Sequence, residues 1–483
     1  MKPGFTFKDL LQCPGTRVLE GGTLDPDKPL ILSTDSRHLE GADIFLALRG
    51  ERFDGHAFLP QALAAGITIL VVEPEVPLPS LEAGRTVLEV PNTLRWYGDL
   101  AALVRSRFSG KVVTVSGSVG KTTTKELLGR MLGGRCKVHA TSGNFNNLVG
   151  LPLTILSAPP EASLWVLELG TNQTGELPRL LSIAAPDISV LTTIGRAHLG
   201  MFADHAALAQ EKMASLSRLP AKAKAVINLD NQVILSHLDQ VTSPSLTFSC
   251  RPRSERPADI NIERRSPGAD GTLTVQVLFG KESHELTLEN HGPGFLSDVL
   301  AAMTVARELG VTFPELAEAL RRPFELPMRM QRIQGAAGRT ILLDCYNSSP
   351  EAARNALWTF VELKQGQPGL AILGDMRELG NHAHDLHREL GLILAGLELQ
   401  GCLAVGEYAE ALVDGAAEGG FRGSLRSVTS LEEASAILPE LVTGFQWVLL
   451  KASRSMRLEQ LLPGLAPEYR LASSDHSHGH AGA

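Results

Sequence analysis

The stretch "KVVTVSGSVGKTTTKELLGRML", residues 111–132, decides the fold of the central part of the chain. Residues 111–116 form a short apolar run rich in β-branched side chains, which predicts a buried strand. Residues 121–132 repeat apolar side chains at helical spacing, which predicts an amphipathic helix. The turn 117–120 therefore aims backbone N–H groups and the positive end of a helix at one place. This order of strand, glycine turn and helix predicts a binding loop for phosphate.

The loop ends in Gly-Lys-Thr, as nucleotide-binding loops do, but Val115 stands where the G-x-x-x-x-G-K-[ST] pattern has its first glycine. Lys121 is placed to pair with the β- and γ-phosphate oxygens of ATP. The Thr122 hydroxyl is placed to ligate Mg²⁺. The predicted ATP-binding residues of the loop are Gly117, Ser118, Val119, Gly120, Lys121, Thr122 and Thr123.

Strand and helix patterns alternate along the rest of the chain, and 483 residues predict about three domains. Residues 1–88 read as a small α/β unit, and residues 89–322 as a mostly parallel, doubly wound sheet that carries the phosphate loop. Residues 323–470 predict a third domain with a Rossmann-like sheet. The predicted fold class is α/β in three domains, followed by a His-rich tail at 471–483.

Three local patterns refine this organisation. Residues 271–290 alternate apolar and polar side chains on both sides of a Gly-Lys turn, which predicts a half-exposed β-hairpin. Pro463 and Gly464 follow Leu462, so we expect the last helix to end near Leu462. The small, polar tail favours disorder, and a metal-binding role for its histidines stays open.

Composition excludes several classes of function. A net charge of −8, with 43% apolar and 20% charged residues, gives no general attraction to nucleic acid or to anionic membranes. The five cysteines are scattered and never form a C-x-x-C pair, so neither a disulfide framework nor a cysteine zinc site can be read. The stretch "MKPGFTFKDLLQCPG" lacks the apolar core of a signal peptide, and no run of about 18 apolar residues occurs in the sequence. We expect a cytoplasmic monomer without nucleic-acid partners or membrane insertion.

Several stretches resemble the Mur ligase family and its folylpolyglutamate synthetase relatives. "GSVGKTTT" is similar to their G-[ST]-x-G-K-[ST]-[ST] loop, which normally lacks the first Walker glycine. The most specific resemblance is to the branch that adds D-alanyl-D-alanine, and it lies in "GNFNNLVGLPLTIL" (143–156), "DCYNSSPEA" (344–352), "LGDMRELG" (373–380) and "LLKASRSMRLE" (449–459). "STDSR" (33–37) and "GADIFLALRGERFDGHAF" (41–58) resemble the module that holds a UDP-sugar.

The resemblance implies ATP-dependent amide synthesis in the assembly of peptidoglycan precursors. A substrate carboxylate attacks the γ-phosphate of ATP and gives an acyl phosphate and ADP. The amine of D-alanyl-D-alanine then displaces phosphate. The implied partners are UDP-N-acetylmuramoyl-tripeptide, D-alanyl-D-alanine and ATP, and two Mg²⁺ ions are expected.

The resemblance also implies which residues act. Glu168, after the apolar run of "WVLELG", is similar to the Mg²⁺-ligating glutamate of the family, and His198 to the histidine that holds a second Mg²⁺. Lys212 aligns with a lysine that carries a CO₂-derived carbamate, a change that turns a cation into a metal-binding anion. Read without the family, His198 is a structural histidine and Lys212 a solvated helical lysine. The implied catalytic residues are Lys121, Glu168, His198 and Lys212, and the implied metal ligands are Thr122, Glu168, His198 and carbamylated Lys212.

Further binding residues follow from the same stretches. Beside the loop, the implied ATP-binding residues are Asp298, Arg329 and Asp344. The implied substrate-binding residues are Ser33, Asp35, Ser36, Arg37, Asn144, Asn146, Asn147, Tyr346, Asn347, His387, Lys451, Ser453 and Arg454.

One region departs from the family. Gly294, Phe295 and Asp298 stand where relatives carry the His and two Asn of G-x-H-N-x-x-N-x-x-A-A, whose last Asn reads adenine. An aspartate can accept from adenine N6 but cannot donate to N7, so we expect altered adenine recognition and unaltered phosphate binding.

Two other functions stay open. A Mur ligase that adds a diamino acid would need its own amino-acid-reading motif, such as a D-N-P-R-like stretch, in the last domain, and none is found. A nucleotide-gated protein that hydrolyses ATP without ligation is favoured only by the altered adenine patch. Short hinges between the sheets also predict that the last domain closes over the substrates from an open form.

Overall fold

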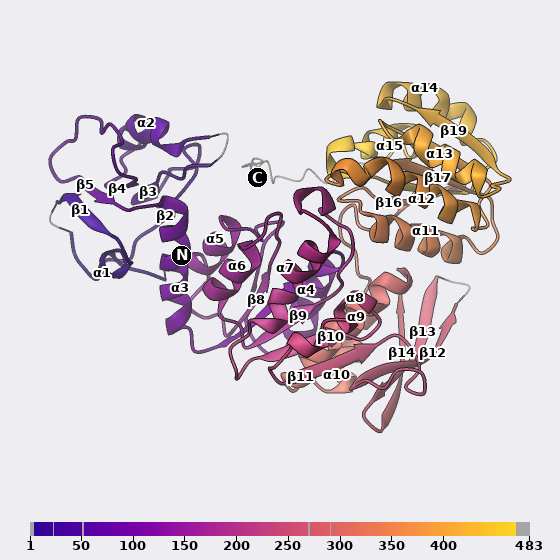
Figure 1. Cartoon of the computed structure of the whole chain (residues 1–483), viewed down its shortest axis with the longest axis horizontal. Coiled ribbons are helices and arrows are strands. Elements are labelled where there is room, and N and C mark those ends of the chain that lie inside the picture. Colours follow the sequence, from indigo (N-terminus) through magenta and orange to yellow (C-terminus); the bar gives the residue numbers. More distant parts are fainter. Residues whose placement is uncertain (1–3, 23, 51–52, 269–270, 290, 470–483) are drawn as a thin grey trace.

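Three sheets follow one another along the chain, and helices cover each of them (Figure 1). The α/β fold class with three units is therefore confirmed.

No helix in the described part of the chain combines the length and apolar character that crossing a membrane requires. The predicted disordered tail, 471–483, lies outside the described residues. The computed structural model describes residues 4–22, 24–50, 53–268, 271–289 and 291–469.

The N-terminal sheet has five strands in the order β1-β5-β4-β3-β2. Strands β2 to β5 are parallel, and β1 lies antiparallel at one edge. The apolar runs that form β3 and β4 are completely buried, as expected for inner strands. The elements are α1 (Phe7–Gln12), β1 (Arg17–Glu20), β2 (Leu32–Ser33), β3 (Ile44–Leu46), η1 (Gly55–Phe58), α2 (Leu59–Ala64), β4 (Ile69–Val72) and β5 (Thr86–Glu89).

Helix α3 (Thr93–Arg107) connects this sheet to the central one. Its Trp96 and Tyr97 are buried in one apolar cluster together with side chains of β3 and β4 and of the central helices α5 and α6. The N-terminal unit is thus packed onto the central unit through a shared core.

The central sheet has the order β14-β13-β12-β11-β10-β9-β6-β8-β7. The chain leaves β6 toward β7 and β8 and then returns to β9 on the other side, so the carboxyl ends of β6, β8 and β9 form the switch point at which such sheets bind ligands. The elements are β6 (Lys111–Ser116), α4 (Lys121–Leu132), β7 (Val138–Ala140), α5 (Gly150–Leu156), β8 (Leu164–Glu168), α6 (Glu176–Ala184), β9 (Ile188–Leu191), η2 (Leu199–Met201), α7 (His205–Ser217), β10 (Lys224–Asn228), α8 (Gln232–Leu235), η3 (Leu238–Gln240), β11 (Ser245–Ser249), β12 (Ile260–Pro267), β13 (Thr272–Phe279), β14 (Glu282–Glu289), α9 (Gly292–Glu308) and α10 (Phe313–Arg321).

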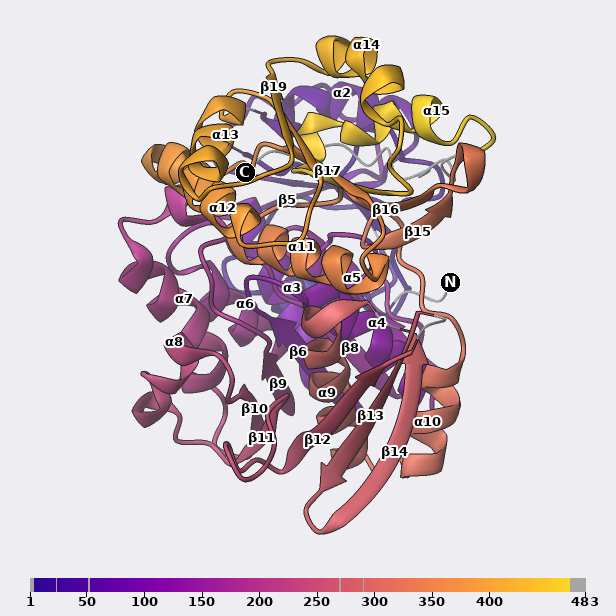
Figure 2. The same ribbon diagram turned by 90° about the vertical axis from the view of Figure 1, so that its right-hand side faces the viewer.

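The expected hairpin is confirmed as β13 and β14. These strands pair antiparallel around the turn at Gly280 and Lys281. They continue the sheet beyond β12 and lie beside α10 (Figure 2).

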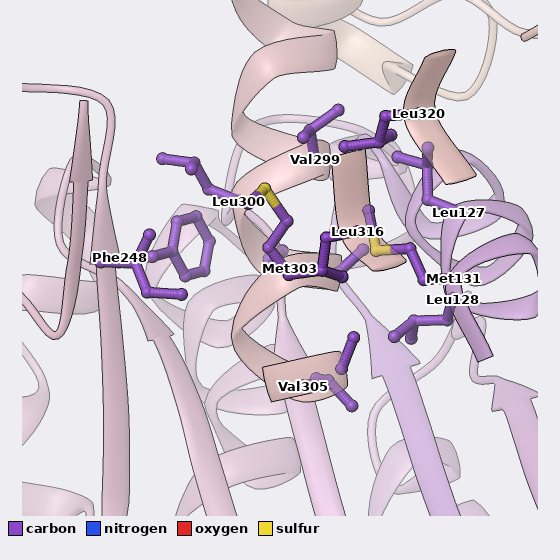
Figure 3. Close-up of a cluster of buried hydrophobic side chains, with 14 of the residues drawn as sticks. Leu127, Leu128, Met131, Phe248, Val299, Leu300, Met303, Val305, Leu316 and Leu320 are labelled. Atoms are coloured by element: carbon purple, nitrogen blue, oxygen red, sulfur yellow. The ribbon is translucent and has the colours of Figure 1, made fainter. Parts of the chain in front are cut away.

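The amphipathic helix that follows the phosphate loop is confirmed as α4. Its Leu127, Leu128 and Met131 point into a core that α9 and α10 share, and each is at most 3% exposed (Figure 3). Burying a side chain of this size contributes about 1.5–3 kcal/mol. This core therefore holds the start of α4, and with it the phosphate loop, against the sheet.

The C-terminal sheet has the order β15-β16-β20-β17-β18-β19, with β15 antiparallel and the other strands parallel. The prediction that the last helix ends near Leu462 is wrong, because Leu462 begins α15 and Pro463 lies in its first turn, where a missing N–H breaks no helical bond. The elements are β15 (Gln331–Gln334), η4 (Ala336–Gly338), β16 (Thr340–Asp344), α11 (Pro350–Lys364), β17 (Gly369–Gly374), η5 (Gly380–His382), α12 (Ala383–Ala395), β18 (Gly401–Val405), α13 (Ala409–Glu418), β19 (Ser424–Val428), α14 (Leu431–Leu441), β20 (Trp447–Lys451), η6 (Arg454–Met456), η7 (Leu458–Leu461) and α15 (Leu462–Leu465).

Helices α11 and α12 lie between the C-terminal sheet and the central unit (Figure 2). Leu199, Phe202 and Leu208 of the central unit belong to the same apolar cluster as side chains of these two helices. The last domain is therefore docked on the central domain, and the opening motion stays a prediction.

Candidate active site

The phosphate loop needs both of its glycines. Gly117 and Gly120 have φ of 140° and 89°, in the left-handed region that side chains rarely adopt. A Cβ on Gly117 would lie 2.0 Å from Thr192 Oγ1, and a Cβ on Gly120 would lie 2.0 Å from Asp298 Oδ1. The loop can therefore follow this path only with glycine at both positions.

Lys121, Thr122 and Glu168 meet at the switch point. Lys121 Nζ donates to the Gly117 carbonyl at 2.9 Å, and Thr122 Oγ1 donates to Glu168 Oε2 at 2.9 Å. Glu168 ends β8 and is 2% exposed. Burial lowers the pKa of Lys121, while the charge of Glu168 opposes this shift. The first turn of α4 and the end of β8 thus place an ammonium, a hydroxyl and a carboxylate together.

The three asparagines of the "GNFNN" stretch have different positions. Asn146 Nδ2 donates to Glu168 Oε1 at 2.8 Å, so it belongs to the site. Asn147 Oδ1 accepts from Val149 N and Gly150 N at 3.1 and 2.9 Å, which caps the start of α5. Asn144 is exposed.

Arg329 carries a second cation into the site from the start of the C-terminal domain. Its Nη2 donates to Thr122 Oγ1 at 3.0 Å, and its guanidinium lies 4.1 Å from the centre of the Tyr346 ring. The charge of Arg329 also lowers the pKa of Lys121. Two cations beside a glycine loop at a helix N-terminus suit a polyphosphate.

His198 lies where the two domains touch. Its Nδ1 contacts the carboxylate of Glu378 from the C-terminal domain, and the bond to His198 lowers the pKa of Glu378. Both residues have left-handed backbones, with φ of 63° and 66°. Strain of this kind costs about 1–3 kcal/mol per residue and clusters at functional sites.

Glu378 was not among the site residues predicted from the sequence. Its stretch, "LGDMRELG", nevertheless places a carboxylate shortly after the buried strand β17. Strand ends are where sites lie in such sheets, so that position was the available signal.

Lys212 on α7 is 2% exposed, which excludes a solvated helical lysine. Burial, helped by the charge of Lys121, lowers the pKa of Lys212 to about 7, and Glu211 opposes the shift. Glu211 in turn accepts from Gly175 N and Leu177 N at 2.8 and 2.7 Å, which fixes α7 against the start of α6.

Among the predicted metal ligands, the Thr122 hydroxyl, the Glu168 carboxylate and the His198 ring carry donor atoms, whereas Lys212 carries an amine, which Mg²⁺ does not prefer as a ligand. No cluster of three His, Cys, Asp or Glu side chains that could hold a metal occurs within the described residues. Mg²⁺ typically takes one or two protein carboxylates and completes its shell with phosphate oxygens and water. The donor set therefore fits Mg²⁺ bound together with a polyphosphate rather than a metal held by protein alone.

Several of the predicted site residues of the C-terminal domain lie near Arg329. Lys451 is 2% exposed, and its Nζ lies 3.1 Å from Asp344 Oδ2 and donates to the Asn347 carbonyl. Tyr346 lies under the Arg329 guanidinium. The structure thus brings Asp344, Tyr346, Asn347 and Lys451 to the edge of the phosphate site.

Comparisons with known proteins agree with this arrangement. The descriptions "Mur ligase family, catalytic domain", "Mur ligase middle domain" and "Mur ligase, glutamate ligase domain" match residues 30–105, 115–306 and 328–454. The chain is 31% identical over 457 residues to the UDP-N-acetylmuramoyl-tripeptide--D-alanyl-D-alanine ligase of Escherichia coli (strain K12), covering 93% of this chain and 97% of that one. The chain belongs to the Mur ligase family.

Other relatives of this Mur ligase carry the same name or the same fold. The ligase of Synechocystis sp. (strain ATCC 27184 / PCC 6803 / Kazusa) with that name is 32% identical over 451 residues, covering 90% of this chain and 92% of that one. Crystal structure I of MurF from Acinetobacter baumannii matches with a TM-score of 0.85 at 28% identity, covering 95% and 98% of the two chains. The MurF ligase of Thermotoga maritima in complex with ADP matches with a TM-score of 0.79 at 28% identity, covering 90% and 96%.

Three further candidates of this Mur ligase serve local structure. His387 is 1% exposed; its Nδ1 donates to the Ala383 carbonyl at 2.6 Å, and its Nε2 accepts from Met376 N at 2.9 Å. These bonds define a neutral ring, and burial lowers its pKa. Ser453 Oγ accepts from Arg377 N at 2.9 Å, and Arg454 pairs with Glu459. His387 and Ser453 therefore hold the turn that carries Glu378.

Ser33 ends β2 in the N-terminal domain, and Asp35, Ser36 and Arg37 follow it. Arg37 donates to Asp35 through Nη2 at 2.7 Å and Nε at 2.9 Å, and this pairing holds the pKa of Asp35 well below its usual range. Ser33 Oγ donates to the His38 carbonyl at 2.9 Å. Gln61 Nε2 donates to the Ser36 carbonyl at 3.0 Å. The structure does not unite this segment with the phosphate loop.

The residues at the altered adenine positions differ in location. Asp298 on α9 is 8% exposed beside Gly120, and burial raises its pKa well above the usual range. Phe295 packs instead against the ring of Phe324, 5.4 Å between centres. A Cβ on Gly294 would lie 3.0 Å from Asn355 Nδ2 of α11. Altered adenine recognition stays a prediction.

Proposed function

We propose that this Mur ligase joins D-alanyl-D-alanine to UDP-N-acetylmuramoyl-tripeptide at the expense of ATP. Its similarity to ligases of that name over more than nine-tenths of their length carries this conclusion. The meeting of Lys121, Thr122, Glu168 and Arg329 at one switch point supports it. We also propose that the protein is a monomer and acts in the cytoplasm, where ATP and UDP-linked precursors are found.

The reaction proceeds in two displacements. A carboxylate oxygen of the tripeptide attacks the γ-phosphorus, the bond from that phosphorus to the bridging oxygen breaks, and ADP leaves. The amine nitrogen of the dipeptide then attacks the carbonyl carbon of the acyl phosphate, phosphate leaves with the oxygen, and the nitrogen loses a proton. Both attacks bring groups of like charge or poor reactivity together, so catalysis is mainly positioning and charge neutralisation.

The predicted residues around the phosphate loop and those near Arg329 have these roles in the scheme. The Gly117–Gly120 loop and Lys121 bind the β- and γ-phosphates, and Arg329 neutralises their charge from the opposite side. Asn146 orients Glu168 and faces the substrate carboxylate. Asp344 binds ATP, Tyr346, Asn347 and Lys451 bind the incoming dipeptide, and the 33–37 segment binds the UDP moiety.

Thr122, Glu168, His198 and carbamylated Lys212 would hold two Mg²⁺ ions. When bound, Mg²⁺ supplies charge neutralisation on the phosphate oxygens. Lys212 is suited to carbamylation because a buried amine with a pKa of about 7 is neutral in an appreciable fraction of molecules near neutral pH, and only the neutral amine adds to CO₂. The carbamate would turn a buried cation beside Lys121 into an anion, which removes their repulsion.

A coupled assay tests the proposal. Purified protein with ATP, Mg²⁺ and UDP-N-acetylmuramoyl-tripeptide should release phosphate at an appreciable rate only after D-alanyl-D-alanine is added, with one pentapeptide product per phosphate. Replacing the dipeptide by lysine or diaminopimelate, with a UDP-dipeptide acceptor, tests for the diamino-acid ligase. Equal phosphate release without any amine would contradict ligation and support the nucleotide-gated protein.

A further inference from the structure

Arg196, in the segment that follows β9, reaches across the domain boundary. Its Nη1 and Nη2 donate to the two carboxylate oxygens of Glu389 on α12 at 2.6 and 2.9 Å. Its Nε and its backbone N–H donate to the two oxygens of Glu351 on α11 at 3.1 and 3.0 Å. The bond to Arg196 lowers the pKa of Glu389. One residue of the central domain thus holds two carboxylates of the last domain through four hydrogen bonds.

The segment that carries Arg196 also forms hydrogen bonds to the phosphate loop. Gly195 N donates to Ser118 Oγ at 2.9 Å, and Ser118 N donates to the Thr193 carbonyl at 2.8 Å. Val119 N donates to Thr193 Oγ1 at 3.2 Å. Residues 193–196 therefore connect the phosphate loop directly to α11 and α12.

Close backbone contacts leave little freedom in how the domains dock. A Cβ on Gly195 would lie 2.6 Å from Glu351 Oε2, and a Cβ on Gly200 would lie 2.3 Å from Gly380 N. Gly200 N also donates to the Glu378 carbonyl at 3.0 Å. These close contacts belong to the docked arrangement, in which His198 also meets Glu378.

We propose that Arg196 is a positioning residue of the ligation. By clamping Glu351 and Glu389 it docks the C-terminal domain against the phosphate loop, and the docked domain keeps water from the acyl phosphate until the amine arrives. This inference rests on the proposed function. Bidentate, charge-assisted bonds are among the strongest in proteins, whereas the apolar contact beside them carries no direction. Losing the clamp therefore loosens docking without separating the domains.

Phosphate released per peptide bond formed measures this role, because a loss of active protein lowers both products equally. We expect a ratio near one for the unaltered protein. Arg196→Gln, and independently Glu389→Gln, should raise the ratio to roughly two or more and lower kcat about 10-fold, as expected for lost charge-assisted bonds. The double variant should be no worse than Arg196→Gln alone, because Arg196→Gln already removes the contact that Glu389→Gln removes.

Arg388→Gln is a matched control. Arg388 precedes Glu389 on α12, but it pairs with Glu418 of its own domain. Its substitution should leave both the ratio and kcat unchanged. The inference is overturned if Arg196→Gln and Glu389→Gln keep a ratio of one, or if their effects on kcat multiply in the double variant. Failure of the proposed function would look different, since the unaltered protein would then show no phosphate release that depends on D-alanyl-D-alanine.

Discussion

The phosphate loop and the 33–37 segment both bind phosphate-containing ligands in the proposed function, yet they are built differently. The loop is fixed by partners far away in the sequence, including Glu168, Thr193, Asp298 and Arg329. The bonds of the 33–37 segment come mostly from its own neighbours, and the side chain of Arg37 is 60% exposed.

This difference separates two kinds of contribution to the reaction. A site held by many buried partners is fixed before the substrates bind, so its residues should act mainly on kcat. An exposed segment binds substrate and transition state alike, so its residues should act on KM. Substitutions in the two regions test this division.

The largest effect is expected from Lys121→Ala. Removing the ammonium that faces the phosphates should lower kcat by about 10³-fold, as loss of a preorganised electrostatic group does. Because burial lowers the pKa of Lys121, its charge is unfavourable in the absence of ligand, and the melting temperature should not fall. Steady-state assays and thermal unfolding measure both. Coupling at the unaltered rate would contradict the assignment of the loop.

Lys212→Ala should lower kcat by about 100-fold, because the proposed carbamate anion is lost. Acetate or formate should restore part of the activity by supplying a carboxylate. In the unaltered protein at limiting bicarbonate, activity should rise as pH increases through about 7, where the amine becomes neutral. No response to bicarbonate, together with no rescue by small carboxylates, would contradict carbamylation.

Lys212 also allows a stability test, because the lowered pKa of Lys212 fixes the direction in which the free energy of unfolding changes with pH. Its pKa in the folded protein, about 7, lies below the value of about 10.4 for an unfolded chain. Between these values the unfolded chain binds more protons, so the free energy of unfolding should increase with pH. Lys212→Met should remove this increase. Urea titrations at pH 7 and pH 9 in bicarbonate-free buffer measure it.

Gly120→Ala should mainly lower the stability of the protein around the phosphate loop, with little direct effect on the chemical step. The added Cβ would lie 2.0 Å from Asp298 Oδ1 at a φ of 89°, and the expected loss is about 1–3 kcal/mol of stability together with weaker ATP binding. Gly129→Ala on the same helix is the control, because a Cβ there meets nothing within 4 Å. That variant should gain about 0.5–1 kcal/mol. Equal melting temperatures for the two variants would contradict the steric role of Gly120.

Local features of the fold and site could be predicted from the sequence. The strand, turn and helix around the phosphate loop are fixed by hydrophobic spacing and by glycine, and the β13–β14 hairpin by alternation around a turn. Glu168 could be placed because the carboxyl end of an inner strand is a predictable location. Pro463 led to the wrong prediction for the end of the last helix, because proline is as compatible with a helix start as with a helix end.

Contacts between domains could not be predicted in this way. Arg196 and Glu389 are 193 residues apart, and nothing local in either stretch indicates that they pair. Glu378 reaches His198 only because two strained turns meet at the domain boundary. His387 resembled a ligand-binding residue, but its two ring nitrogens bond to the backbone of Ala383 on its own helix and of Met376 in the turn after β17. Such roles depend on docking geometry, which periodicity does not encode.

The smallest effect is expected in the exposed segment. Arg37→Gln should raise KM for the UDP-linked tripeptide about 10-fold and leave kcat within about twofold, because a uniform binding contact is lost. Arg17→Gln is the control: Arg17 is also an exposed arginine of the N-terminal domain, paired with Glu89 at 3.5 Å, and its loss should change neither constant. A fall in kcat for Arg37→Gln at saturating substrate would mean that the N-terminal domain helps to reach the transition state, and the division between the two regions would then fail.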